Sequence, residues 1–75
     1  MALSETMVKE LRTAVVRLRS QIAAVQTQGE FVAADLAATQ DIARRKALQV
    51  QADALAAQTI TLGGGLSAAL AALAA

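Results

Sequence analysis

Residues 8–25 read VKELRTAVVRLRSQIAAV, and the spacing of the large apolar side chains in this stretch decides the fold class. These side chains follow one another at alternating intervals of three and four residues: Val8, Leu11, Val15, Leu18, Ile22 and Val25. The alternation is typical of a helix that packs along another helix, and β-branched residues alternating with mostly Leu favour two-helix packing. We call these six residues the first seam. Their spacing leaves open whether the partner helix belongs to the same chain.

The rest of the chain is equally suited to helices. The whole chain contains 20 Ala and no Pro, and most of its polar residues are good helix formers. Ser4 is a suitable N-cap for the first helix. We therefore predict an all-α protein with two long Ala-rich amphipathic helices and a short C-terminal helix, packed as a coiled coil or bundle with other helices.

The Gly residues are the natural interruptions of this helical pattern. They divide one helical unit, residues 1–75, into the following segments: a heptad helix 4–28, a long helix 30–62, a hinge at Gly63, Gly64 and Gly65, and an apolar tail 66–75. Gly29 is ambiguous, because it either begins a hairpin or stays inside a bent rod at a cost of about 1 kcal/mol. Three consecutive Gly predict a firm helix stop, since Gly loses the most backbone entropy on ordering.

Leu residues mark the surfaces that we expect the later segments to bury. They recur every seven residues in the long segment, and three more share one face of the tail: Leu48, Leu55, Leu62, Leu66, Leu70 and Leu73. A second apolar line on the long segment passes through Val32, Leu36 and Val50. Two lines on one helix indicate contacts with more than one neighbour. We predict that these Leu residues and the first seam form the interface.

The residue types that perform most enzyme chemistry are missing. The chain has no His, Cys or Tyr, so the common general bases and soft nucleophiles are absent. The triple Gly run has no accompanying Lys and Ser or Thr, as a phosphate-binding loop requires. We therefore expect no enzymatic activity, no catalytic residues, no cofactor and no metal site.

The core residues are too few for a stable isolated monomer. The large apolar side chains number 22, and small domains usually compensate with disulfides, metals or oligomerisation. Without Cys or His, oligomerisation remains. We expect a structural or interaction subunit that packs on copies of itself or on a larger assembly, such as a virion, a filament or tube, or a secretion apparatus. The net charge of +1 gives no strong field to attract nucleic acid, so we expect no such partner.

Two alternatives stay open. Residues 54–75 contain no charged side chain, and this length can span a bilayer, so the chain could be membrane-active or membrane-anchored through this tail. It could also be a small helical regulator that binds a partner helix through the first seam. The N-terminus lacks the basic and apolar regions of a secretory signal peptide. This predicts cytoplasmic synthesis, with incorporation into a virion or export by a specialised system, and defines no final compartment.

Overall fold

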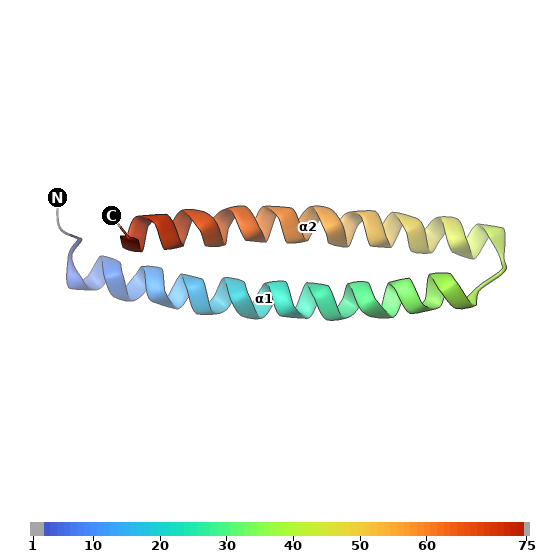
Figure 1. Cartoon of the computed structure of the whole chain (residues 1–75), viewed down its shortest axis with the longest axis horizontal. Helices are drawn as coiled ribbons and strands as arrows, with labels where there is room; N and C mark the ends of the chain where they lie inside the picture. Colours follow the sequence, from blue (N-terminus) through green and yellow to red (C-terminus); the bar gives the residue numbers. More distant parts are fainter. Residues whose placement is uncertain (1–2, 75) are drawn as a thin grey trace.

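The computed structural model describes residues 3–74, which form two antiparallel helices joined by a short turn (Figure 1). Helix α1 spans Glu5–Ala38, and helix α2 spans Ile42–Ala74. The helices lie side by side along nearly their whole length, and the molecule measures 57 × 15 × 13 Å. The prediction of an all-α chain with two long helices is confirmed, and its hairpin form is the one observed.

Ser4 begins α1 as an N-cap. Its side-chain Oγ accepts a hydrogen bond from the backbone N–H of Met7 at 3.2 Å. Glu5 follows in the first turn, where a negative charge interacts favourably with the helix dipole. The predicted start of the first helix therefore agrees with the structure.

Of the two possibilities at Gly29, the hairpin turn is excluded and the residue stays inside a helix, because α1 runs through it to Ala38. Gly29 is half-buried, and it stands four residues after Val25 and three before Val32, so it continues the spacing of the first seam. Its backbone does not adopt a positive φ. Packing against α2 on both sides of Gly29 offsets the cost of about 1 kcal/mol that Gly imposes on a helix.

The predicted hinge at residues 63–65 and the separate C-terminal helix are also wrong. Helix α2 is continuous through Gly63, Gly64 and Gly65, and none of them has a positive φ. Residues 66–74 of the predicted tail are the last turns of α2, and Ala75 lies outside the described residues.

Contacts with α1 explain why the triple Gly run stays helical. Leu62 and Leu66, on either side of the run, are half-buried in the hairpin. A Cβ built on Gly65 would lie 3.7 Å from Cδ1 of Leu18, so α2 approaches α1 closely at this point. Tertiary packing therefore outweighs the weak intrinsic preference of Gly against helix.

The hairpin turn occupies residues 39–41, a stretch without Gly or Pro. Asp41 begins α2, because its Oδ1 accepts hydrogen bonds from the backbone N–H groups of Ala43 at 3.0 Å and Arg44 at 3.4 Å. This is the pattern of an N-cap carboxylate. The Asp side chain thus supplies the start signal for the second helix.

The end of α1 is closed by a side chain from α2. Arg45 Nη1 donates hydrogen bonds to the backbone carbonyl oxygens of Leu36 at 3.5 Å and Thr39 at 3.2 Å. Carbonyl groups in the last turn of a helix lack partners within the helix, and a cation is favourable there. Arg45 therefore ties the first turn of α2 to the last turn of α1.

Candidate functional site

The first seam lies on the face of α1 that α2 covers. Val15 is buried, with 7% of its surface exposed, and the other five seam residues are half-buried. Since α2 is the other helix of the described chain, these residues meet a partner helix within the same hairpin. The structure thus answers the question that the spacing left open.

The Leu residues of α2 form the opposing surface. Leu48 is 8% exposed, and four others are half-buried: Leu55, Leu62, Leu66 and Leu73. Leu70 keeps 40% of its surface exposed, so it lies at the margin of the contact with α1. Ala69, at 8%, occupies the buried position instead.

The predicted interface left out several members of this packing surface, including Val32 and Leu36, which the sequence placed only on a second apolar line. These members continue the alternating spacing of three and four residues across the Gly residues. They are Gly29, Val32 and Leu36 on α1, and Ala52, Thr59 and Ala69 on α2. Thr59 is compatible with half-burial because its Oγ1 donates a hydrogen bond to the carbonyl oxygen of Leu55 at 3.0 Å. The missed signal was the continuity of the spacing, from Val8 to Leu36 and from Leu48 to Leu73.

The resulting core is thin. Among residues 3–74, three side chains are buried and none is fully enclosed: Val15, Leu48 and Ala69. The accessible surface is 5626 Å², against about 4,300 Å² expected for a compact protein of this mass. The radius of gyration is 17.1 Å, against about 11 Å for a compact chain of this length. The isolated hairpin therefore exposes much surface that a globular fold would bury.

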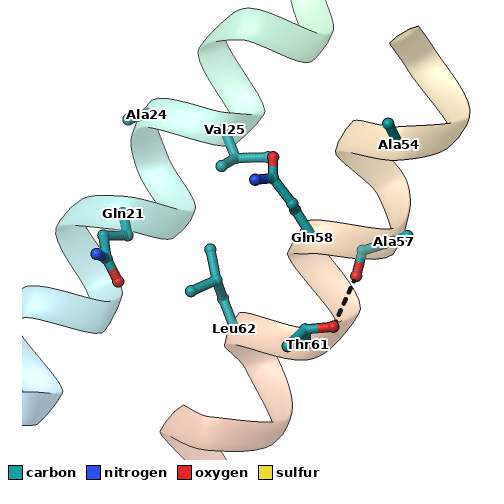
Figure 2. Close-up of a pocket in the computed structure, with 8 residues that line it drawn as sticks. All are labelled: Gln21, Ala24, Val25, Ala54, Ala57, Gln58, Thr61 and Leu62. Atoms are coloured by element: carbon teal, nitrogen blue, oxygen red, sulfur yellow. Dashed lines mark hydrogen bonds between the residues drawn. The ribbon is translucent and has the colours of Figure 1, made fainter.

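A groove runs along one side of the hairpin, between the two helices. It consists of two adjoining cavities of about 670 and 420 Å³ that share Ala54. Figure 2 shows the larger cavity, with Val25 of α1 and Gln58 and Leu62 of α2 pointing into the space between the helices. The lining residues are Gln21, Ala24, Val25, Gln28, Phe31 and Val32 from α1, and Gln51, Ala54, Leu55, Ala57, Gln58, Thr61 and Leu62 from α2.

None of these lining residues carries a charge, and we call this surface the uncharged groove. Its chemistry is that of methyl groups and side-chain amides, which can pack and form hydrogen bonds. The other hollows on the surface border basic side chains, such as Arg12 and Arg17 on α1 or Arg45 and Lys46 on α2. The described residues include no group of three or more Asp or Glu placed to hold a metal ion.

Helix α2 has a second notable surface property. Its residues 54–74 carry no charged side chain. By length and composition α2 is able to cross a membrane, with a mean hydropathy of 1.3 over an 18-residue window. The core helices of soluble proteins meet the same criterion.

The fold and its surfaces define a two-helix hairpin with a thin core and an uncharged groove. The chain matches no known protein-family model, no curated protein and no solved structure.

Proposed function

We propose that this protein is a non-enzymatic structural or interaction subunit that completes its core by packing its helices against further copies of itself or against a larger assembly. The observation that carries this proposal is the thin core of the hairpin. Among the described residues, three side chains are buried, while Phe31 and Ile60 are left 70% and 77% exposed. A core of this size is a weak basis for an isolated fold. A coiled-coil or bundle arrangement with additional helices buries this surface.

The expected energetics support the same conclusion. A single core in a chain of this size rarely supplies more than about 3–5 kcal/mol. Among residues 3–74, seven large apolar side chains are left exposed: Met7, Val16, Phe31, Ile42, Val50, Ile60 and Leu70. Completing the burial of these side chains in an assembly contributes at most about 1.5–3 kcal/mol for each of them, before the cost of association. The candidate settings for such a subunit are a virion, a filament or tube, and a secretion apparatus.

Size-exclusion chromatography with light scattering tests this proposal. We expect a mass that is a multiple of 7.7 kDa, and a melting temperature that rises with concentration between about 1 and about 100 μM. Mass action produces this rise because association stabilises only the folded chain. A cooperatively folded monomer with a constant melting temperature over the same range contradicts the proposal.

A membrane-associated function is the second candidate, and the uncharged residues 54–74 of α2 are the observation that favours it. Flotation with liposomes separates the two functions. If the protein assembles with other helices in water, it stays in the dense fraction. Flotation that is lost on Ile60→Lys and kept on Ile42→Lys would support the membrane function instead. Both Ile side chains are more than 70% exposed on α2, and Ile42 lies outside the uncharged segment.

The regulator alternative has a structural cost. Helix α2 already covers the first seam, so a foreign helix could bind there only after the hairpin opened. A binding partner would have to replace the contacts of α2 as well as add its own. We therefore favour assembly through the outer surfaces of the hairpin.

A further inference from the structure

We propose that the uncharged groove is the face on which a second copy of this chain docks, with corresponding helices antiparallel and Arg17 of each copy opposite Asp35 of the other. The inference rests on the proposed self-assembly and names the surface responsible for it. Three features carry it: the composition of the groove, the placement of charges at its ends, and the area available for burial.

The groove can be buried without removing charges from water. Its lining includes the exposed residues Ala24, Ala54 and Ala57, whose small side chains allow another helix to approach closely. Phe31, the one aromatic residue of the chain, lies on its rim with 70% of its surface exposed. Burial of unpaired ions is costly, and a surface without them avoids this cost. An exposed aromatic beside small residues is a suitable anchor for an interface.

The charges beside the groove are arranged at its two ends. On α1 a single stripe follows intervals of four and three residues along the groove side: Arg17, Gln21, Ala24, Gln28, Phe31 and Asp35. This spacing places all six on one face of the helix. The stripe thus begins with an exposed cation, ends with an exposed anion, and is uncharged between them.

A two-fold axis that crosses α1 at the middle of this stripe makes the stripe complementary to itself. Most homodimers have such symmetry, in which the same surface of both copies meets. Reversing the helix direction places Arg17 against the second copy's Asp35, and the symmetric pair forms at the other end. In the resulting four-helix bundle, each helix runs antiparallel to its two neighbours, as in other up-and-down bundles.

The two charges cannot pair within one chain. They are 18 residues apart on the continuous helix α1, a separation of about 27 Å. Any measured coupling between Arg17 and Asp35 must therefore act between two copies. This separation makes the proposed arrangement directly testable.

The available area and the polarity of the groove favour a second copy over lipid. Over its whole surface, and not only in the groove, the hairpin exposes about 1,300 Å² more than a compact protein of its mass, and a standard interface buries about 800 Å² on each partner. Gln21, Gln28, Gln51 and Gln58 line the groove, and burying amide groups in hydrocarbon without partners is unfavourable.

A charge-swap cycle tests the proposal. Light scattering and sedimentation at low ionic strength give the dimer dissociation constant for the wild type, Arg17→Asp, Asp35→Arg and the double variant. Each single change converts both symmetric pairs from attraction to repulsion, so we expect the constant to rise about tenfold. The double variant restores opposite charges at both ends and returns the constant to within about threefold of the wild type. High salt reduces these differences because it screens exposed charges.

Arg19→Asp is the matched control. Arg19 is an exposed cation on the same helix, outside the stripe, so we expect its replacement to change the constant by less than about threefold. Circular dichroism verifies that every variant remains helical. Two outcomes would show that the groove is not the interface and that self-assembly uses another face. In the first, the single variants weaken association and the double variant does not restore it. In the second, the wild type associates and none of the changes affects its dissociation constant. A wild type that is monomeric at every concentration overturns both this inference and the proposed function.

Discussion

Replacement of Leu18 with Asp is expected to abolish cooperative folding of the hairpin. Leu18 lies in the middle of the first seam, and its Cδ atoms reach within 3.8 Å of the position that a Cβ on Gly65 would occupy. The opposing stretch of α2, residues 54–74, contains no cation that could pair with a carboxylate. An unpaired carboxylate at this contact would cost about 3 kcal/mol or more, which is comparable to the whole stability expected for a chain of this size.

Circular dichroism during thermal unfolding measures this effect. Leu18→Asp should lose most of its helical signal at room temperature and show no sigmoidal transition. Val16→Asp is the control, because Val16 is 69% exposed on the same helix and the same carboxylate stays in water there. We expect the control to unfold cooperatively near the wild-type temperature. Equal melting curves for the two variants would show that Leu18 does not face a packed surface.

Replacement of Gly63, Gly64 and Gly65 together by Ala is expected to stabilise the protein by about 2–3 kcal/mol, since each Gly costs a helix about 1 kcal/mol relative to Ala. The added methyl groups have room. A Cβ at Gly63 or Gly64 meets nothing within 4 Å, and at Gly65 it makes an ordinary contact with Leu18. For a domain of this size, the gain corresponds to a rise of about 10 °C or more in melting temperature.

Gly29→Ala provides an internal comparison for this triple change. Gly29 also lies within a helix, and a Cβ added to it would meet nothing within 4 Å. The single change should therefore contribute about 1 kcal/mol, roughly a third of the triple effect. A lower melting temperature for the triple variant, together with a gain for Gly29→Ala, would mean that residues 63–65 act as a joint in solution rather than as continuous helix.

The two long helices and their shared packing surface were predictable from the spacing of large apolar residues. The positions of the breaks were not, because Gly propensity is a weak local signal and packing overrides it. Gly29 stands in line with the first seam, and α2 passes close to Leu18 at Gly65, so the helical conformation at both positions is compatible with packing between the helices. The actual turn contains neither Gly nor Pro, and depends on hydrogen bonds made by Asp41 and Arg45.

The uncharged groove could not be predicted from the spacing of apolar residues. Its lining depends on which residues of α1 lie beside which residues of α2, and the position of the turn sets this register. With a turn at Gly29, Val25 would not lie beside Gln58 and Leu62, as it does in Figure 2. A turn placed ten residues too early therefore removes every cross-helix neighbour that forms the groove.

The first turn of α1 and the last turn of α2 lie at the same end of the molecule (Figure 1). A mechanical force that pulls these two ends apart acts across the helix pair rather than along it. The contacts between the helices then separate one after another, beginning near Val8 and Leu73 and ending at the turn. Each step therefore breaks only a small part of the core. The hairpin resists such peeling weakly, whereas a force that slides one helix along the other must break all its contacts at once.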